Sequence, residues 1–145
     1  MKRVFVVAGL FAVTVAAAVA ADDPIKARKA LMKENGKQAK EGVAMVKGEA
    51  PFDLAKAKAI LATFENAAVK APPLFPDTAK EGGETQALPA IWQNKADFEQ
   101  RFTKLGADAK AAEASVTDLA GFKTAFSGIG KDCGGCHELY REKQQ

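Results

Sequence analysis

The chain has 145 residues, of which 48% are hydrophobic and 27% are charged, with a formal net charge of +3. This length and balance fit one globular domain and exclude a disordered chain, and a total of two cysteines excludes a disulfide-dense scaffold. The single histidine excludes any site that needs several imidazoles from one chain.

Residues 1–21 have the features of a secretory signal peptide. Two basic residues precede a long uncharged run of Val, Phe, Leu and Ala, and residues 18–20 show the small-x-small pattern that signal peptidase accepts. We expect cleavage after Ala20 or Ala21, and an uncleaved membrane anchor is the alternative. The mature domain, residues 22–145, then has 19 basic and 18 acidic residues, so neither nucleic acid nor an anionic membrane is expected as a partner.

The first of four expected helices begins at Asp22 or Asp23 and ends within residues 47–51. Its apolar residues recur at intervals of three and four, the period of an amphipathic helix. The expected inward face carries Ile25, Arg28, Met32, Asn35, Ala39, Val43 and Val46. Gly36 and Gly42 weaken this helix and are expected to allow the close approach of a neighbouring helix.

The second and third expected helices are separated by the longest irregular stretch of the chain. The second begins near 51–53 and runs to about Ala71, where two prolines stop it. Loops as long as 72–89 are often functional in a compact domain, and this one is expected to cover the edge of a ligand. Pro89 opens the third helix, which is predicted as one helix to Ala112.

The fourth expected helix begins near 115–118 and reaches the carboxyl end. Its predicted face carries Phe122, Phe126, Ile129, Cys133, Cys136, His137 and Tyr140. No segment alternates in the manner of a strand. Four helices joined by two short connections and one long one predict an all-α fold, an antiparallel four-helix bundle.

The run Cys133-Gly134-Gly135-Cys136-His137 carries most of the functional information. Cys-x-x-Cys-His is the attachment signature of c-type haem. On a helix, positions i, i+3 and i+4 lie on one side, so the two sulfurs and the imidazole converge on one planar object. The motif therefore predicts one haem c bound covalently through Cys133 and Cys136, with His137 as an iron ligand.

Three other interpretations of the motif are weaker. A thioredoxin-like redox pair follows a strand in a βαβ unit, whereas this motif lies near the end of an all-helical chain. A zinc site usually has four ligands, and the chain offers two cysteines and one histidine. A disulfide across so short a loop would stabilise the fold little.

The second axial ligand of the iron has few candidates. With no second histidine, the remaining soft ligand is a methionine, and Met1 leaves with the signal peptide. Met45 lies near the far end of the first helix, whereas Met32 lies on its apolar face, four residues after Arg28. Met32 is therefore the candidate ligand, with simple packing as the alternative. Arg28 is a candidate to pair with a haem propionate, and Phe126 is a candidate apolar contact, although it also fits the core.

Several motifs together resemble the class II c-type cytochromes, the cytochrome c-prime and cytochrome c-556 family. They are Gly130–Arg141, Arg28–Met32, Lys47–Asp53 and Pro89–Trp92, in the family's order across the mature chain. The resemblance implies a four-helix bundle with haem c between helices and His137 as fifth ligand. It also implies that Met32 lies on the distal face and that Arg141 lies beside the proximal ligand. Residues 31–36 look closer to the low-spin cytochrome c-556 type.

The expected function is that of a periplasmic electron carrier rather than an enzyme. His/Met ligation would keep the iron low-spin and raise its potential relative to two histidines. Its partners would be redox proteins met by transient contact, with no membrane association after signal cleavage, and the protein would be a monomer or a homodimer. The alternatives are a five-coordinate protein that binds nitric oxide or carbon monoxide and, more remotely, a haem-free thiol or zinc module.

Overall fold

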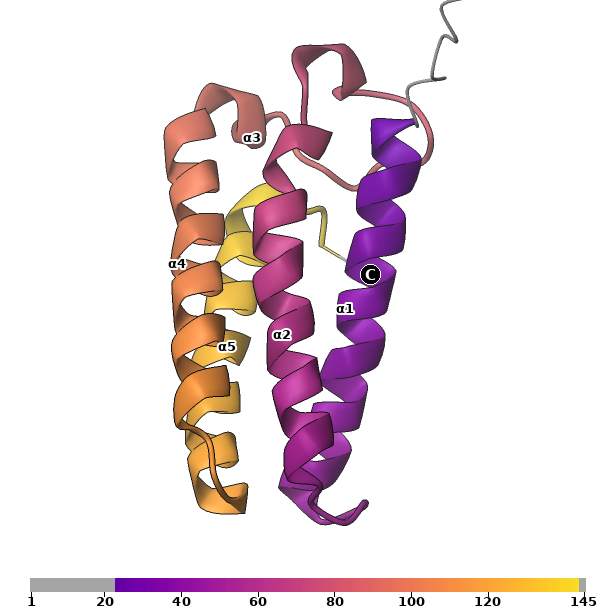
Figure 1. Ribbon diagram of the computed structural model, residues 1–145. Helices are drawn as coiled ribbons and strands as arrows, with labels where there is room; N and C mark the ends of the chain where they lie inside the picture. Colours follow the sequence, from indigo (N-terminus) through magenta and orange to yellow (C-terminus); the bar gives the residue numbers. More distant parts are fainter. Residues whose placement is uncertain (1–22, 144–145) are drawn as a thin grey trace, which may run out of the picture.

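The computed structural model describes residues 23–143, so the predicted signal peptide lies outside the described residues. Four long helices lie side by side and alternate in direction (Figure 1): α1 (Pro24–Lys47), α2 (Leu54–Lys70), α4 (Lys95–Ser115) and α5 (Leu119–Tyr140). The connection between α2 and α4 contains a short helix and two 3-10 turns: α3 (Ala90–Gln93), Pro72–Leu74 and Asp77–Ala79. The predicted antiparallel four-helix bundle is confirmed. Within 23–143 no helix combines the length and apolarity needed to cross a membrane.

Aspartate side chains begin three of the long helices. Asp23, Asp53 and Asp118 each accept a hydrogen bond, at 2.8 to 2.9 Å, from a backbone N–H in the first turn of α1, α2 and α5. Such caps satisfy N–H groups that have no partner inside the helix. At the other end of α1, Gly48 adopts a left-handed conformation with φ of 75°, which a glycine reaches without steric cost. The capped starts of α1, α2 and α5 and the end of α1 therefore lie close to the positions that the sequence predicts.

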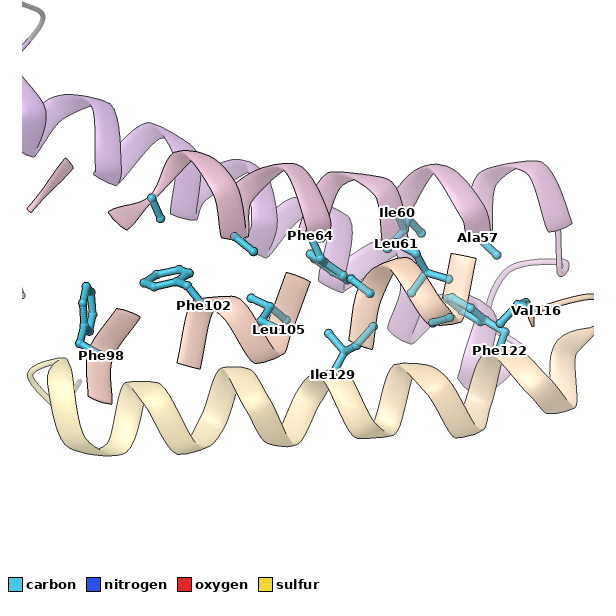
Figure 2. Close-up of a cluster of buried hydrophobic side chains, with 14 of the residues drawn as sticks. Ala57, Ile60, Leu61, Phe64, Phe98, Phe102, Leu105, Val116, Phe122 and Ile129 are labelled. Atoms are coloured by element: carbon cyan, nitrogen blue, oxygen red, sulfur yellow. The ribbon is translucent and has the colours of Figure 1, made fainter. Parts of the chain in front are cut away.

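The core runs the length of the bundle between α2, α4 and α5 (Figure 2). α2 packs along α4, and α4 also packs along α5. The largest fully buried side chains are Phe122, Met45, Ile60, Leu61, Ile91 and Val116. Within α2 the buried residues recur at intervals of three and four, as burial of one helix face requires; they are Ala57, Ile60, Leu61, Phe64, Ala67 and Ala68.

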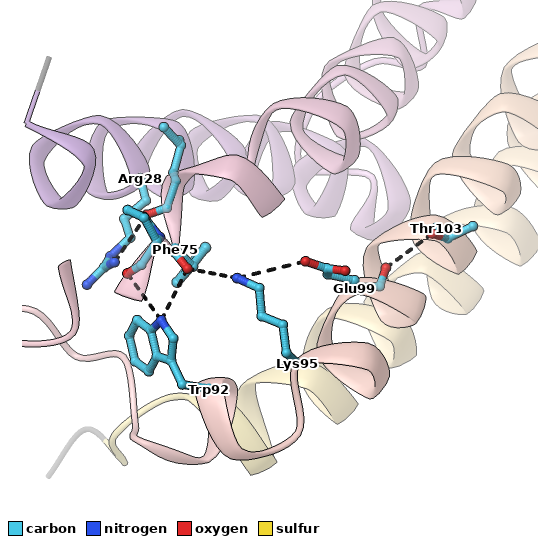
Figure 3. A network of polar contacts seen from close by, with 8 residues as sticks. Arg28, Phe75, Trp92, Lys95, Glu99 and Thr103 are labelled. Carbon is cyan, nitrogen blue, oxygen red and sulfur yellow. Dashed lines mark hydrogen bonds and ion pairs between the residues drawn. The ribbon is translucent and has the colours of Figure 1, made fainter. Parts of the chain in front are cut away.

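The predicted third helix is interrupted, which corrects the sequence interpretation. Asn94 has φ of −126° and ψ of 47°, outside the helical region, and separates α3 from α4. One side chain on each side of the break binds the same backbone oxygen. Trp92 Nε1 donates to Phe75 O at 3.1 Å, and Lys95 Nζ donates to Phe75 O at 2.7 Å. The break lets both side chains reach Phe75, which lies just after α2 (Figure 3).

The inward face of α1 also differs from the prediction in its second half. Val43 is 37% exposed, whereas Gly42 is buried and Met45 is 2% exposed. A Cβ atom on Gly42 would lie 2.6 Å from Cζ of Phe126, so only glycine admits this ring. The expected close approach thus occurs at Gly42, and the space beside Gly36 is open.

Candidate cofactor site

A cavity of about 770 Å³ opens at the end of the bundle where α5 finishes. Its volume lies in the range of about 300 to 1,000 Å³ that is usual for small-molecule and cofactor sites. Residues of α1, the connection 84–87, α4 and the last turn of α5 line it. The buried part of its wall is largely aromatic and is formed by Phe75, Phe98, Phe102 and Tyr140, with Ile91.

The Cys-x-x-Cys-His motif lies within the last two turns of α5 and does not interrupt the helix. Cys136 and His137 line the cavity, and Cys133, one turn earlier, packs against the core cluster. All three side chains are partly exposed, and both cysteines are free thiols. Because the helix is continuous, the three functional groups lie on one side of it, as the spacing predicts.

The electrostatic surroundings of these groups distinguish between the possible chemistries. Burial raises the pKa of the Cys133 thiol and raises the pKa of the Cys136 thiol to about 11. Reactive redox cysteines have lowered pKa values, so the thiol-redox interpretation loses support. Burial, and secondarily the charge of Arg141, lowers the pKa of His137. A neutral imidazole, the form that binds iron, is therefore favoured near neutral pH.

A polar network between α4 and α5 contacts the backbone of the Cys-x-x-Cys-His motif. Arg101 Nη1 donates to the carbonyl of Gly135 at 3.3 Å, and its Nε donates to Asp97 at 2.7 Å. Tyr140 donates its hydroxyl proton to the same carboxylate at 2.6 Å. Sequence reasoning missed this network, although the spacing of Asp97 and Arg101 by four residues on a helix is a typical ion-pair signal. Its effect is to hold the last turns of α5 against α4.

Arg28 is buried, at 4% exposure, and lines the cavity from α1. Its guanidinium donates three hydrogen bonds, to Leu74 O at 3.2 Å, to Ala79 O at 3.0 Å and to Thr85 Oγ1 at 2.6 Å. It also lies 4.7 Å from the ring centroid of Phe75, a cation–π contact (Figure 3). Arg28 therefore fixes the connection between α2 and α4 over the cavity, a role that sequence reasoning did not foresee.

Arg141 lines the cavity from the residue that follows α5. The backbone here pairs with the connection: Ala87 and Arg141 form an isolated antiparallel bridge, and Leu88 N donates to Tyr140 O at 3.0 Å. Glu142 N donates to Gln86 O at 2.8 Å. The Nε atom of Arg141 is buried and has no hydrogen-bond partner within residues 23–143. A buried cationic donor of this kind fits an anionic group in the cavity.

The last two predicted site residues lie in different places. Met32, half-buried on α1, lines the same cavity as His137. Phe126 does not line it; its ring packs beside Gly42, and its centroid lies 6.3 Å from that of Phe64 and 5.2 Å from that of Phe122. Phe126 is eleven residues before His137, about 16 Å along the helix axis, which explains why it does not reach the cavity.

These residues fit a covalently attached haem. Two thiols one helical turn apart would supply both attachment points, the adjacent imidazole would supply an iron ligand, and the buried wall is largely apolar. Arg28 and the unpartnered Nε of Arg141 would offer positive charge to the propionates of such a haem. Among the residues that the structure describes, no group of three or more His, Cys, Asp or Glu side chains is placed to hold a metal ion directly.

A four-helix bundle with Cys-x-x-Cys-His in its last helix, facing an apolar cavity with cationic groups, defines a helical-bundle protein of c-type haem. The chain belongs to the cytochrome c' family, whose model, described as Cytochrome C', matches residues 23–141. Proteins of this family carry covalent haem c with iron, and they are electron carriers or gas-binding proteins. This chain is accordingly a haem c protein of the same kind.

The similarity extends over the whole described domain. The chain is 42% identical to cytochrome c' of Rhodopseudomonas palustris over 98% of this chain and 97% of the relative. The solved structure of cytochrome c' from Rhodopseudomonas palustris has a TM-score of 0.82, at 42% identity, with 85% of this chain and 98% of that chain covered.

Two further relatives carry different names. Cytochrome c-556 of Agrobacterium fabrum is 41% identical over 93% of this chain and 92% of the relative. A nitric oxide complex of a mutant cytochrome c prime from Alcaligenes xylosoxidans has a TM-score of 0.72 at 28% identity, with 83% of this chain and 94% of that chain covered. Relatives at nearly the same identity thus include both a cytochrome c' and a cytochrome c-556.

Proposed function

We propose that the mature protein is a periplasmic monohaem electron carrier, with haem c attached through Cys133 and Cys136. In this proposal His137 is the proximal iron ligand and Met32 is the distal one. The observation that carries it is the shared cavity: Met32 enters from α1 and His137 from α5, two helices at the two ends of the sequence. The thioether and the imidazole are the pair that raises a haem potential and favours the low-spin state.

The bound haem would supply reversible one-electron oxidation and reduction at its iron. The role of the chain is to hold that group still and to limit its contact with water. The aromatic wall would keep water from the bound haem, and Arg28 and Arg141 would bring positive charge to its propionates. Burial keeps the pKa of His137 low, so the imidazole is available as a neutral ligand.

In this proposal the protein is not an enzyme and makes or breaks no covalent bond of a substrate. The one acidic side chain that lines the cavity, Glu84, is exposed and pairs with Lys29 at 3.5 Å. The only imidazole is the proposed iron ligand, so the cavity lining within residues 23–143 offers no other histidine for general acid or base catalysis. The partners would be redox proteins that bind transiently, and the protein would act as a monomer or a homodimer.

A second candidate function is gas binding by a five-coordinate iron. Two observations favour it: a relative at 42% identity is named cytochrome c', and a structural relative was solved as a nitric oxide complex. Met32 is also only half-buried, which is compatible with a side chain that packs over the iron without binding it. In that case the distal wall would remain apolar, and nitric oxide or carbon monoxide would be the ligands.

Optical spectra of the haem-loaded protein separate the two functions. The electron-carrier proposal expects a low-spin spectrum with a methionine-to-ferric charge-transfer band, which Met32→Leu removes. Met45→Leu is the matched control, because Met45 is buried in the core and does not line the cavity. A high-spin spectrum in the wild type that shifts readily with carbon monoxide would replace this proposal with gas binding.

A further inference from the structure

The mouth of the cavity lies between α1 and the connection that precedes α3. Six of the lining residues are exposed, and they come from the outer face of α1 and from residues 84–86: Lys26, Lys29, Ala30, Lys33, Glu84 and Gln86. We call these six residues the rim. Because the buried lining residues lie behind them, a partner that approaches the cofactor through the mouth meets the rim first.

Positive charge is concentrated around this cavity. Five cationic side chains line it, three on the rim and two deeper at Arg28 and Arg141, against the single acidic side chain of Glu84. The mature domain has 19 basic and 18 acidic residues, so 14 basic and 17 acidic residues remain elsewhere. A domain that is almost neutral overall is therefore strongly polarised, with a charge of +4 at the cavity and −3 over the rest.

Two lysines of the rim are the strongest candidates to act on a partner. Lys29 is engaged locally, because its Nζ donates to Gly83 O at 3.1 Å and pairs with Glu84. Lys26 and Lys33 make no ion pair within residues 23–143, and both are exposed. They are seven residues apart on one face of α1, about 10 Å along the axis, so they flank the mouth.

We propose that Lys26 and Lys33, with Lys29 between them, form the docking surface for an acidic electron-transfer protein. This inference rests on the proposed carrier function and names the kind of partner. Complementary charge raises the rate of encounter and orients the partner toward the mouth without requiring a large interface. Rapid release then remains possible, because exposed ion pairs contribute little to affinity.

The first test measures the local charge with small oxidants. One electron passes from the ferrous protein to hexacyanoferrate(III), which yields ferric protein and hexacyanoferrate(II), and stopped-flow absorbance gives the second-order rate constant. The double variant Lys26→Gln/Lys33→Gln should lower this rate about tenfold at low ionic strength and raise the rate with cationic tris(phenanthroline)cobalt(III). Both effects should disappear at high salt. Lys29 is left unchanged because of its contacts with residues 83 and 84.

The matched control is Lys58→Gln/Lys123→Gln, which removes the same charge far from the mouth. Lys58 lies in the first turns of α2, and Lys123 is fourteen residues before His137, about 21 Å along α5. The control should change either rate by less than about twofold. Equal effects of the two double variants, or rates that do not depend on salt, would overturn the docking surface.

A protein donor and a neutral oxidant complete the test. Reduction of the ferric protein by reduced flavodoxin, an acidic protein, should slow with salt and fall in Lys26→Gln/Lys33→Gln far more than in the control. If hexacyanoferrate responds and flavodoxin does not, the rim attracts small anions only and the docking surface is refuted. Oxidation by neutral p-benzoquinone should be the same in all variants. Failure of the wild type to exchange electrons with any reagent would refute the carrier function and this inference with it.

Discussion

Replacement of Arg28 by methionine is expected to lower the free energy of unfolding of the holoprotein by about 3 kcal/mol. Methionine retains an apolar stem but supplies no donor, so Leu74 O, Ala79 O and Thr85 Oγ1 lose a partner 3.2, 3.0 and 2.6 Å away. An acceptor left without a partner in a buried site costs about 1 to 3 kcal/mol. The lower figure applies to each of the three, because two of the bonds are only partly buried, Thr85 Oγ1 still accepts from Ala87 N at 3.2 Å, and the cost of burying the guanidinium charge disappears at the same time.

Urea unfolding of the ferric holoprotein, followed by far-ultraviolet circular dichroism, measures this change. Arg28→Lys should restore less than half of the loss, because one ammonium group cannot reach three acceptors that a planar guanidinium serves together. Lys37→Met is the control further along α1, where the side chain is exposed and lies away from the connection. If Arg28→Met unfolds within about 0.5 kcal/mol of the wild type, these hydrogen bonds do not stabilise the connection and the reasoning is wrong.

Two further predictions concern the glycines of α1 and the acid stability of the α4–α5 network. Gly42→Ala should destabilise the protein by about 1 to 3 kcal/mol because the ring of Phe126 must move, whereas Gly36→Ala, with open space around it, should stabilise it by up to about 1 kcal/mol; similar urea midpoints for the two variants would contradict this packing. Hydrogen bonds from Arg101 and from the hydroxyl of Tyr140 lower the pKa of Asp97 in the folded protein. This carboxylate therefore stabilises the fold above its unfolded-state pKa of about 3.9, and the contribution is lost as pH falls through the lower folded-state value. Asp97→Asn should flatten the fall of the urea midpoint between about pH 5 and pH 2, and an unchanged pH profile would exclude this role.

Local patterns predicted the elements that depend on local physics. The aspartate at the start of α1, the prolines after α2 and the three-and-four spacing placed α1, α2 and α5 close to where they lie, since each signal acts within a few residues. The Cys-x-x-Cys-His motif was equally readable, because its geometry follows from one continuous helix. Met32 was placed on the apolar face of α1, and it does line the cavity together with His137.

The features that sequence reasoning missed depend on distant partners. The spacing of apolar residues continues across Asn94, so nothing local indicates the break; Trp92 and Lys95 bind Phe75, seventeen and twenty residues earlier. The acceptors of Arg28 lie 46 to 57 residues away, so its role in fixing the connection could not be read from its own helix. For Phe126 the shared face was read correctly, but the distance along the axis was not considered.

The backbone pairing at the end of α5 has a mechanical consequence. Leu88 and Gln86 bind the main chain at Tyr140 and Glu142, just beyond the imidazole of His137. The segment that lines the mouth of the cavity is therefore fastened to the helix that carries His137, and the pairing couples their movements. A small displacement at the end of that helix would therefore be passed to Gln86, whose side chain is exposed at the mouth of the cavity.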